Sequence, residues 1–138
     1  MSADDCIFCK IAAGKIPCNK IYEDEAVLAF LDIGPVSRGH TLVIPKEHFA
    51  TLHECPEELL AKVTACVRKF AAAVVDAAGA QAYNVLCNNG RAAGQLVEHV
   101  HFHLIPRNAD DGVFNHWPAG KYEKGQAEAI AAEICSRL

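Results

Sequence analysis

The spacing of apolar residues predicts one long helix in the middle of the chain. Over residues 56–79, apolar side chains recur every three or four positions, which places them on one helical face. Pro56 suits a first helical position because its missing N–H would have no partner there, and Glu57 and Glu58 follow at the positive end of the helix dipole. Gly79 can end the helix in a left-handed conformation. We expect this helix to form one wall of the core.

Short runs rich in β-branched and aromatic residues predict strands on both sides of this helix. We expect strands at residues 20–23, 26–31, 40–44, 83–87 and 97–105. A short helical turn is expected at residues 9–13, and a closing helix at residues 123–138 that turns four apolar side chains inward. These four are Ala127, Ile130, Ala131 and Ile134. Without regular alternation of strands and helices, the pattern favours an α+β fold on an antiparallel sheet, and no Gly-rich phosphate loop supports a doubly wound fold.

Length and composition narrow the class of protein. A chain of 138 residues, 51% hydrophobic and 22% charged, fits a single globular domain over residues 1–138, with its core in residues 6–107 and an extension over 108–138. The net charge of −4 gives no general attraction for nucleic acid polymers or anionic membranes. The acidic start is unlike a secretory peptide, and residues 70–80, interrupted by Asp76, fall short of the roughly 20 residues of a membrane span. Seven cysteines without dense pairing indicate a reducing, cytoplasmic compartment.

Three histidines alternate along the last expected strand, at His99, His101 and His103. Successive side chains of a strand point to opposite faces, so the three imidazoles would share one side and the intervening apolar residues the other. Three interpretations stay open: a polar strand face, a catalytic metal site, or a nucleophilic histidine with two helpers. A neutral imidazole can attack phosphorus directly, while its neighbours donate to the phosphate or orient the ring.

The segment His-Val-His-Phe-His-Leu-Ile resembles the signature of the histidine-triad (HIT) family of nucleotide hydrolases and transferases. Further matches to its Hint-like branch are Cys-Ile-Phe-Cys-Lys-Ile at residues 6–11, the Asp-containing segment 29–33, the Ile-Pro-Lys-Glu-His segment within 39–48, Asn-Asn-Gly at 88–90 and Gly-Gln at 94–95. The resemblance runs from about Cys6 to Arg107. It implies a five-stranded sheet that continues across a homodimer.

The same resemblance implies roles for individual residues. His101 would be the nucleophile, His103 would contact the α-phosphate and leaving group, His99 would orient the site, and His40 would support the nucleophile. Asp32 would hold the ribose. An apolar slot for the base would be formed by Phe8, Ile11, Ile16, Phe30, Leu31 and Ile33. Asn88 and Gln95 would contact the phosphate, whereas Leu96 stands where many members have Ser and can offer only its backbone N–H.

Cys6 and Cys9 have the spacing of half a tetrahedral zinc site, and an unmetallated thiol pair or a redox pair are the alternatives. In zinc-containing members of the Hint-like branch, two histidines complete the set. The resemblance places these at His48 and His99. The site would be structural, and no organic cofactor is implied.

The resemblance also suggests an activity and a partner. It implies a nucleoside phosphoramidase or nucleotidyl hydrolase that acts on purine nucleotides such as adenosine 5'-phosphoramidates and releases AMP through a nucleotidyl-histidine. The alternatives are a dinucleoside polyphosphate hydrolase and a zinc-stabilised interaction module. The segment His116-Trp117-Pro118 resembles one that Hint-like dimers place near the partner subunit's active site.

Overall fold

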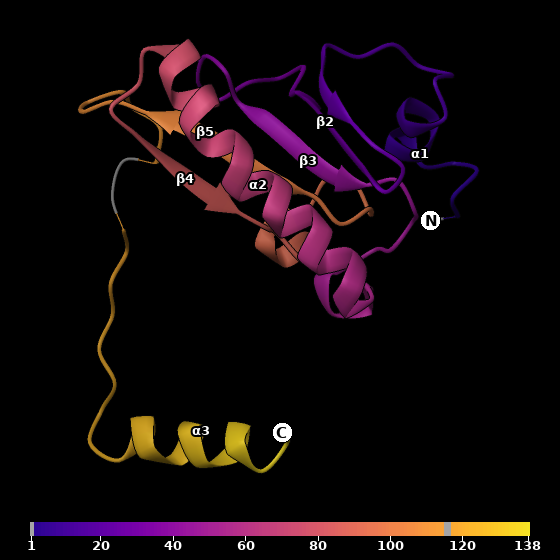
Figure 1. Ribbon diagram of the computed structural model, residues 1–138. Helices are drawn as coiled ribbons and strands as arrows, with labels where there is room; N and C mark the ends of the chain where they lie inside the picture. Colours follow the sequence, from indigo (N-terminus) through magenta and orange to yellow (C-terminus); the bar gives the residue numbers. More distant parts are fainter. Residues whose placement is uncertain (1, 115–116) are drawn as a thin grey trace.

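The computed structural model describes residues 2–114 and 117–138, and within these residues five strands form one sheet. The elements are α1 (Ile7–Ala12), β1 (Lys20–Glu23), β2 (Val27–Leu31), β3 (Thr41–Pro45), α2 (Glu57–Ala78), β4 (Ala82–Leu86), β5 (Phe102–Arg107) and α3 (Gln126–Cys135), with 3-10 turns at Leu52–Glu54 and Arg91–Ala93. The strand order is β1-β2-β3-β5-β4, and all neighbours are antiparallel (Figure 1). This confirms the expected α+β fold.

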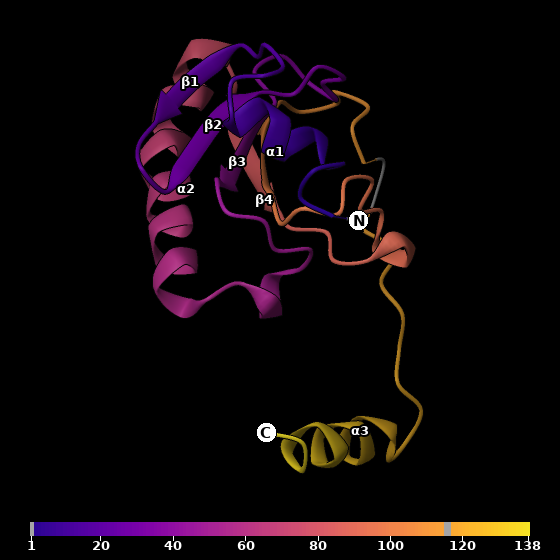
Figure 2. The ribbon, with the colours of Figure 1, turned by 90° about the vertical axis from the view of Figure 1, so that its right-hand side faces the viewer.

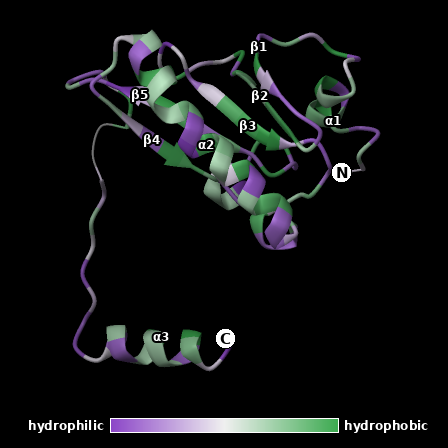
Figure 3. Cartoon of the chain, in the orientation of Figure 1, coloured by the Kyte–Doolittle hydropathy of each residue, from purple (hydrophilic) through white to green (hydrophobic). Residues whose placement is uncertain are grey.

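Helix α2 covers one face of the sheet. It follows Pro56 and ends at Gly79, whose φ of 64° is left-handed as the sequence predicts. Its apolar face packs on alternate residues of the strands, because side chains of a strand point to opposite faces. This cluster contains Val27, Ala29, Val43, Val63, Cys66, Val67, Phe70, Ala71, Val74 and Leu104. Figure 3 shows the matching bands of polar and apolar residues along α2.

The opposite face of the sheet is covered by α1 and the loops around it (Figure 2). Here the other residues of the same strands turn inward, so both faces of β2 and β3 are buried. The second cluster contains Cys6, Phe8, Leu28, Phe30, Leu42 and Ile44. Helix α1 begins at Ile7, two residues before the expected turn.

The last strand is shorter at its start than the expected strand 97–105. β5 begins at Phe102, because the backbone N–H of Val100 donates to Phe49 O in the loop after β3, at 2.7 Å, instead of extending the ladder. β5 then continues through Pro106, which the sequence predicts as its end. The carbonyl of Pro106 accepts a hydrogen bond from Ser37, so its missing N–H faces a loop and not β4.

Helix α3 does not close the core. It stands away from the sheet in both views, joined by an extended segment (Figures 1 and 2). All of its side chains are exposed, including the four expected inward, Ala127, Ile130, Ala131 and Ile134. The expectation failed because a 3.6-residue repeat identifies an apolar face and not the surface that covers it. Among the described residues, no helix is long and apolar enough to cross a membrane.

Candidate active site

The three histidines lie on the α1 side of the sheet but belong to two groups. The rings of His101 and His103 are neighbours, with centroids 4.8 Å apart. The ring of His99 is fully buried and lies against His48, at 5.1 Å, next to the two N-terminal cysteines. The edge-to-face ring of Phe8 contacts both His99 and His101. One group therefore faces a cavity, and the other faces a cluster of thiols.

The hydrogen bond of His101 determines which ring nitrogen is free. Nδ1 of His101 lies 2.6 Å from the carbonyl oxygen of His99, and a carbonyl can only accept, so Nδ1 carries the proton. In the neutral ring, Nε2 then holds a lone pair. Burial lowers the pKa of His101 below its ordinary value, which favours this neutral form at pH 7.

A chain of hydrogen bonds fixes the opposite tautomer in His103, with the proton on Nε2. The backbone N–H of Val36 donates to Nδ1 of His40 at 3.2 Å, so Nε2 of a neutral His40 carries the proton. This Nε2 donates to Nδ1 of His103 at 2.8 Å, and Nε2 of His103 must then carry a proton of its own. Burial, followed by the neighbouring His101 and His40, lowers the pKa of His103 to about 4. A lone pair on His101 thus lies beside an N–H donor on His103.

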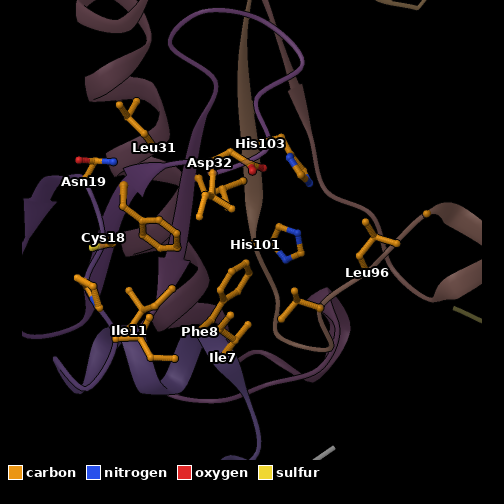
Figure 4. Close-up of a pocket in the computed structure, with 17 residues that line it drawn as sticks. Ile7, Phe8, Ile11, Cys18, Asn19, Leu31, Asp32, Leu96, His101 and His103 are labelled. Atoms are coloured by element: carbon orange, nitrogen blue, oxygen red, sulfur yellow. The ribbon is translucent and has the colours of Figure 1, made fainter.

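These two histidines line a cavity of about 330 Å³ (Figure 4). Asp32 follows β2 at the cavity wall, where its Oδ1 accepts the N–H of Gly34 at 2.8 Å. Most other lining residues are apolar. They include Ile7, Phe8, Ile11, Ile16, Pro17, Phe30, Leu31, Ile33, Leu42, Leu96 and Val97. An apolar slot that ends at a carboxylate and two imidazoles suits a ligand with a flat apolar part and a polar, anionic part.

Three residues expected to bind substrate do not line the cavity. Gln95 is buried, and its amide accepts from the N–H of Gly90 and donates to Ala50 O, both at 2.7 Å. Asn88 is half-buried outside the cavity lining. His40 lies behind His103 and bonds to it, although the sequence resemblance places it against the nucleophile.

Several residues of the lining were not predicted from the sequence, and one of them, Asn19, has a polar side chain. Cys18 and Asn19 precede β1 and reach the cavity because this end of β1 lies beside the end of β2. Ile7, Pro17, Leu42, Gly94 and Val97 complete the missed set. The available signal was the pairing of the two adjacent predicted strands, which brings residues 18–19 close to Leu31 and Asp32.

Cys6, Cys9, His48 and His99 come together as the sequence resemblance implies, with one ligand atom of each within 4.8 Å of all the others. Sγ of Cys6 lies 3.4 Å from Nδ1 of His99, and Sγ of Cys9 lies 3.3 Å from Nδ1 of His48. Tetrahedral zinc with ordinary Zn–S and Zn–N bonds sets such atoms about 3.5 Å apart. Nε2 of His99 donates to Pro45 O at 2.8 Å, which leaves the lone pair of Nδ1 facing the thiols. The four side chains therefore fit structural zinc.

Residues 13–110 match the HIT domain. The adenosine 5'-monophosphoramidase hnt1 of Schizosaccharomyces pombe is 48% identical over 134 residues, covering 96% of this chain and 98% of that protein. A crystal structure of a HIT family member from Bacillus subtilis has a TM-score of 0.89 at 44% identity and covers 97% of each chain. A Zn-bound histidine triad protein from Mycobacterium smegmatis has a TM-score of 0.75 at 35% identity, over 99% of this chain and 100% of that one. The arrangement of the histidines and this similarity along nearly the whole length show that the chain belongs to the HIT family.

Proposed function

We propose that this HIT-family hydrolase cleaves purine nucleoside 5'-phosphoramidates, such as adenosine 5'-phosphoramidate, and releases the nucleoside monophosphate. One observation carries the proposal: Nε2 of His101 holds a free lone pair beside the N–H donor of His103, at the polar end of an apolar cavity. The monophosphoramidase name of the Schizosaccharomyces pombe relative supports this choice of substrate.

The proposed reaction has two displacements at phosphorus. Nε2 of His101 attacks the phosphorus atom, and the P–N bond of the substrate breaks as the nitrogen, protonated from solvent, departs as an amine. The N–H of His103 donates to the phosphoryl group as its charge develops. Water then attacks the nucleotidyl-histidine, its oxygen stays on phosphorus, its proton leaves, and His101 regains its lone pair.

The lining of the cavity supports a place for the ribose and the base of the nucleotide. Asp32, beside the histidines, accepts hydrogen bonds from the ribose hydroxyls, and the apolar walls around Phe8 and Phe30 hold the base. The side chain of Leu96 is 92% exposed at the cavity and has no polar atom, so this loop can give the phosphate only backbone N–H groups. Gln95 helps indirectly by holding the loop to Gly90 and Ala50.

We propose that the four-residue Cys/His group holds a structural zinc ion. The metal would join α1 to the segment before β5 and would hold His99, whose carbonyl oxygen orients the ring of His101. All four ligands would come from the protein, which leaves no open position for substrate. Zinc would therefore support the nucleophile without taking part in the chemistry.

We also propose a homodimer that pairs the β4 edges of two sheets. β4 is the outer strand on this side, and its Tyr83 and Val85 are exposed next to a hollow lined by residues of α2 and Phe102. An exposed apolar strand edge favours pairing with another strand. Trp117 is 88% exposed, which is compatible with a place near the partner subunit's cavity; His116 lies outside the described residues.

The test is hydrolysis of adenosine 5'-phosphoramidate by the purified protein and its His101→Ala and His101→Gly variants. Loss of the nucleophile should lower kcat by roughly 10³-fold or more. His53→Ala is the matched control, because this exposed histidine lies outside the cavity lining. A panel with dinucleoside polyphosphates compares the alternative substrate class. Wild-type rates that persist in the His101 variants would disprove the proposal.

A further inference from the structure

The polar groups of the cavity lie at two separate places. Asp32, His101 and His103 form one group, and the amide of Asn19, next to the thiol of Cys18, forms the other. Figure 4 shows Asn19 and Cys18 on the opposite side of the cavity from His101 and Leu96, with apolar side chains between. The proposed reaction uses only the first group, so the second has no assigned role.

The backbone holds Asn19 at the edge of the cavity beside the end of β2. Its carbonyl oxygen accepts the N–H of Leu31 at 3.0 Å, and Leu31 directly precedes Asp32. Neighbouring strands are about 4.8 Å apart, so the side chain of Asn19 starts one strand spacing from the end of β2. Among the described residues, none hydrogen-bonds the amide of Asn19, which is exposed and free to meet a ligand.

We propose that Asn19 recognises the base of the nucleotide and favours adenine over guanine; this rests on the proposed function above. With phosphorus at His101 and ribose at Asp32, the base extends between the apolar walls, and its polar edge reaches the second group of the lining. The amide of Asn19 offers one donor and one acceptor. Adenine presents the complementary pair at N7 and N6, whereas guanine presents two acceptors, N7 and O6, on the same edge.

The test compares kcat/KM for adenosine and guanosine 5'-phosphoramidates in wild type, Asn19→Ala and Asn19→Asp. The alanine variant should lower the adenosine preference roughly three- to tenfold, mainly through KM, since the contact is exposed to solvent. The aspartate variant loses the donor to N7 and keeps an acceptor, which can still accept from adenine N6 but meets two acceptors, N7 and O6, in guanine. It should therefore lower kcat/KM for both substrates without shifting the preference toward guanosine. Asn108→Ala is the control, an exposed asparagine outside this cavity that should leave the ratio unchanged.

Calorimetric titration of the same variants with AMP and GMP separates this inference from the proposed reaction. If wild type hydrolyses neither substrate but the ratio of AMP to GMP affinity falls in Asn19→Ala, base recognition stands and the reaction is wrong. If neither the kcat/KM ratio nor the affinity ratio changes in Asn19→Ala, the inference is overturned.

Discussion

Two hydrogen bonds decide the chemistry that His101 and His103 can perform. The carbonyl of His99 holds the proton of His101 on Nδ1, and the N–H of His40 holds the proton of His103 on Nε2. Neighbouring rings of the same residue type thus present opposite groups to the cavity, an acceptor and a donor. Neither role depends on a charged imidazole, because burial keeps the pKa of both rings below the ordinary value.

Substitution of His40 tests whether it positions His103. His40→Ala removes the donor to Nδ1 of His103, so the proton of that ring is no longer held on Nε2. We expect kcat to fall roughly 10- to 100-fold with little change in KM. His40→Gln retains an N–H donor and should recover part of the loss. Steady-state kinetics with Tm as a folding control check this, and an equal loss in both variants that follows Tm would indicate a packing role only.

For single residues, the sequence predicts the positions of the cavity histidines better than it predicts the residues that hydrogen-bond to them. Alternation along a strand predicts that His101 and His103 share a face, and the structure shows both rings at the cavity. The bond from His40 to His103 joins residues 63 positions apart, and only the pairing of β3 with β5 sets it. Gln95 lies in a loop, and a loop has no regular repeat of side-chain directions from which its path could be predicted. The two backbone partners of Gln95 therefore could not be predicted.

At the scale of elements, the Cys/His group links α1 to the irregular segment before β5. Cys6 and Cys9 come from the start of the chain, and His48 comes from the loop after β3. His99 comes from the segment before β5, and its ring donates to Pro45 O at the end of β3. Helix α1 has only six residues, too few to be stable alone in water. Its place against the sheet depends on the packing of Phe8 and, in our proposal, on zinc.

Replacement of Cys9 tests the metal. Cys9→Ser should reduce zinc content from about one ion per chain to near zero and lower Tm, since a ligand at a thousandfold excess over its Kd stabilises a fold by about 4 kcal/mol. The folded variant should keep kcat within about tenfold, because zinc lies outside the chemical step. Elemental analysis, thermal unfolding and kinetics measure these effects, with exposed Cys135→Ser as control.

Two other outcomes would change this account of the metal. Wild-type protein that binds no zinc, even when it is supplied, would contradict the structural site. Complete loss of turnover in a Cys9→Ser protein with unchanged Tm would indicate a metal that takes part in catalysis.

The elements themselves were largely predictable, and the exceptions have local causes. Apolar periodicity predicts α2 to within one residue at each end because Pro56 and Gly79 restrict the backbone there. The predicted start of β5 was wrong because the backbone of Val100 bonds to a loop. The alternation of polar and apolar residues carries no information about that contact. The exposed α3 shows that an amphipathic pattern predicts a helix without predicting its neighbour.

At the scale of the whole molecule, the two edges of the sheet differ. The β4 edge adjoins an apolar hollow that continues onto α2, and Val85 beside it is 43% exposed. The β1 edge carries an ion pair between Lys20 and Glu23, and Lys46 also pairs with Glu23. Charged groups at an edge discourage pairing with another strand, so the β4 edge is the better interface.

A charge placed on each edge tests the dimer. Val85→Lys should convert the proposed dimer to a monomer of 14.9 kDa, because it places a charged lysine on the strand edge that pairs with the partner. Ile21→Lys on β1 is the matched control, because Ile21 is also 43% exposed, and this variant should remain dimeric. Sedimentation velocity distinguishes the two states. Dissociation by Ile21→Lys alone would place the interface at β1, and a monomeric wild type would refute the dimer.

The covalent state of His101 during the first turnover tests the proposed reaction most directly. Wild-type protein mixed with excess adenosine 5'-phosphoramidate, quenched within milliseconds without acid and digested, should yield the peptide that contains His101 with one adenylyl group attached. His101→Ala should yield none. Release of AMP in the first turnover while His101 stays unmodified would contradict the proposed reaction, and so would an adenylyl group on a different residue.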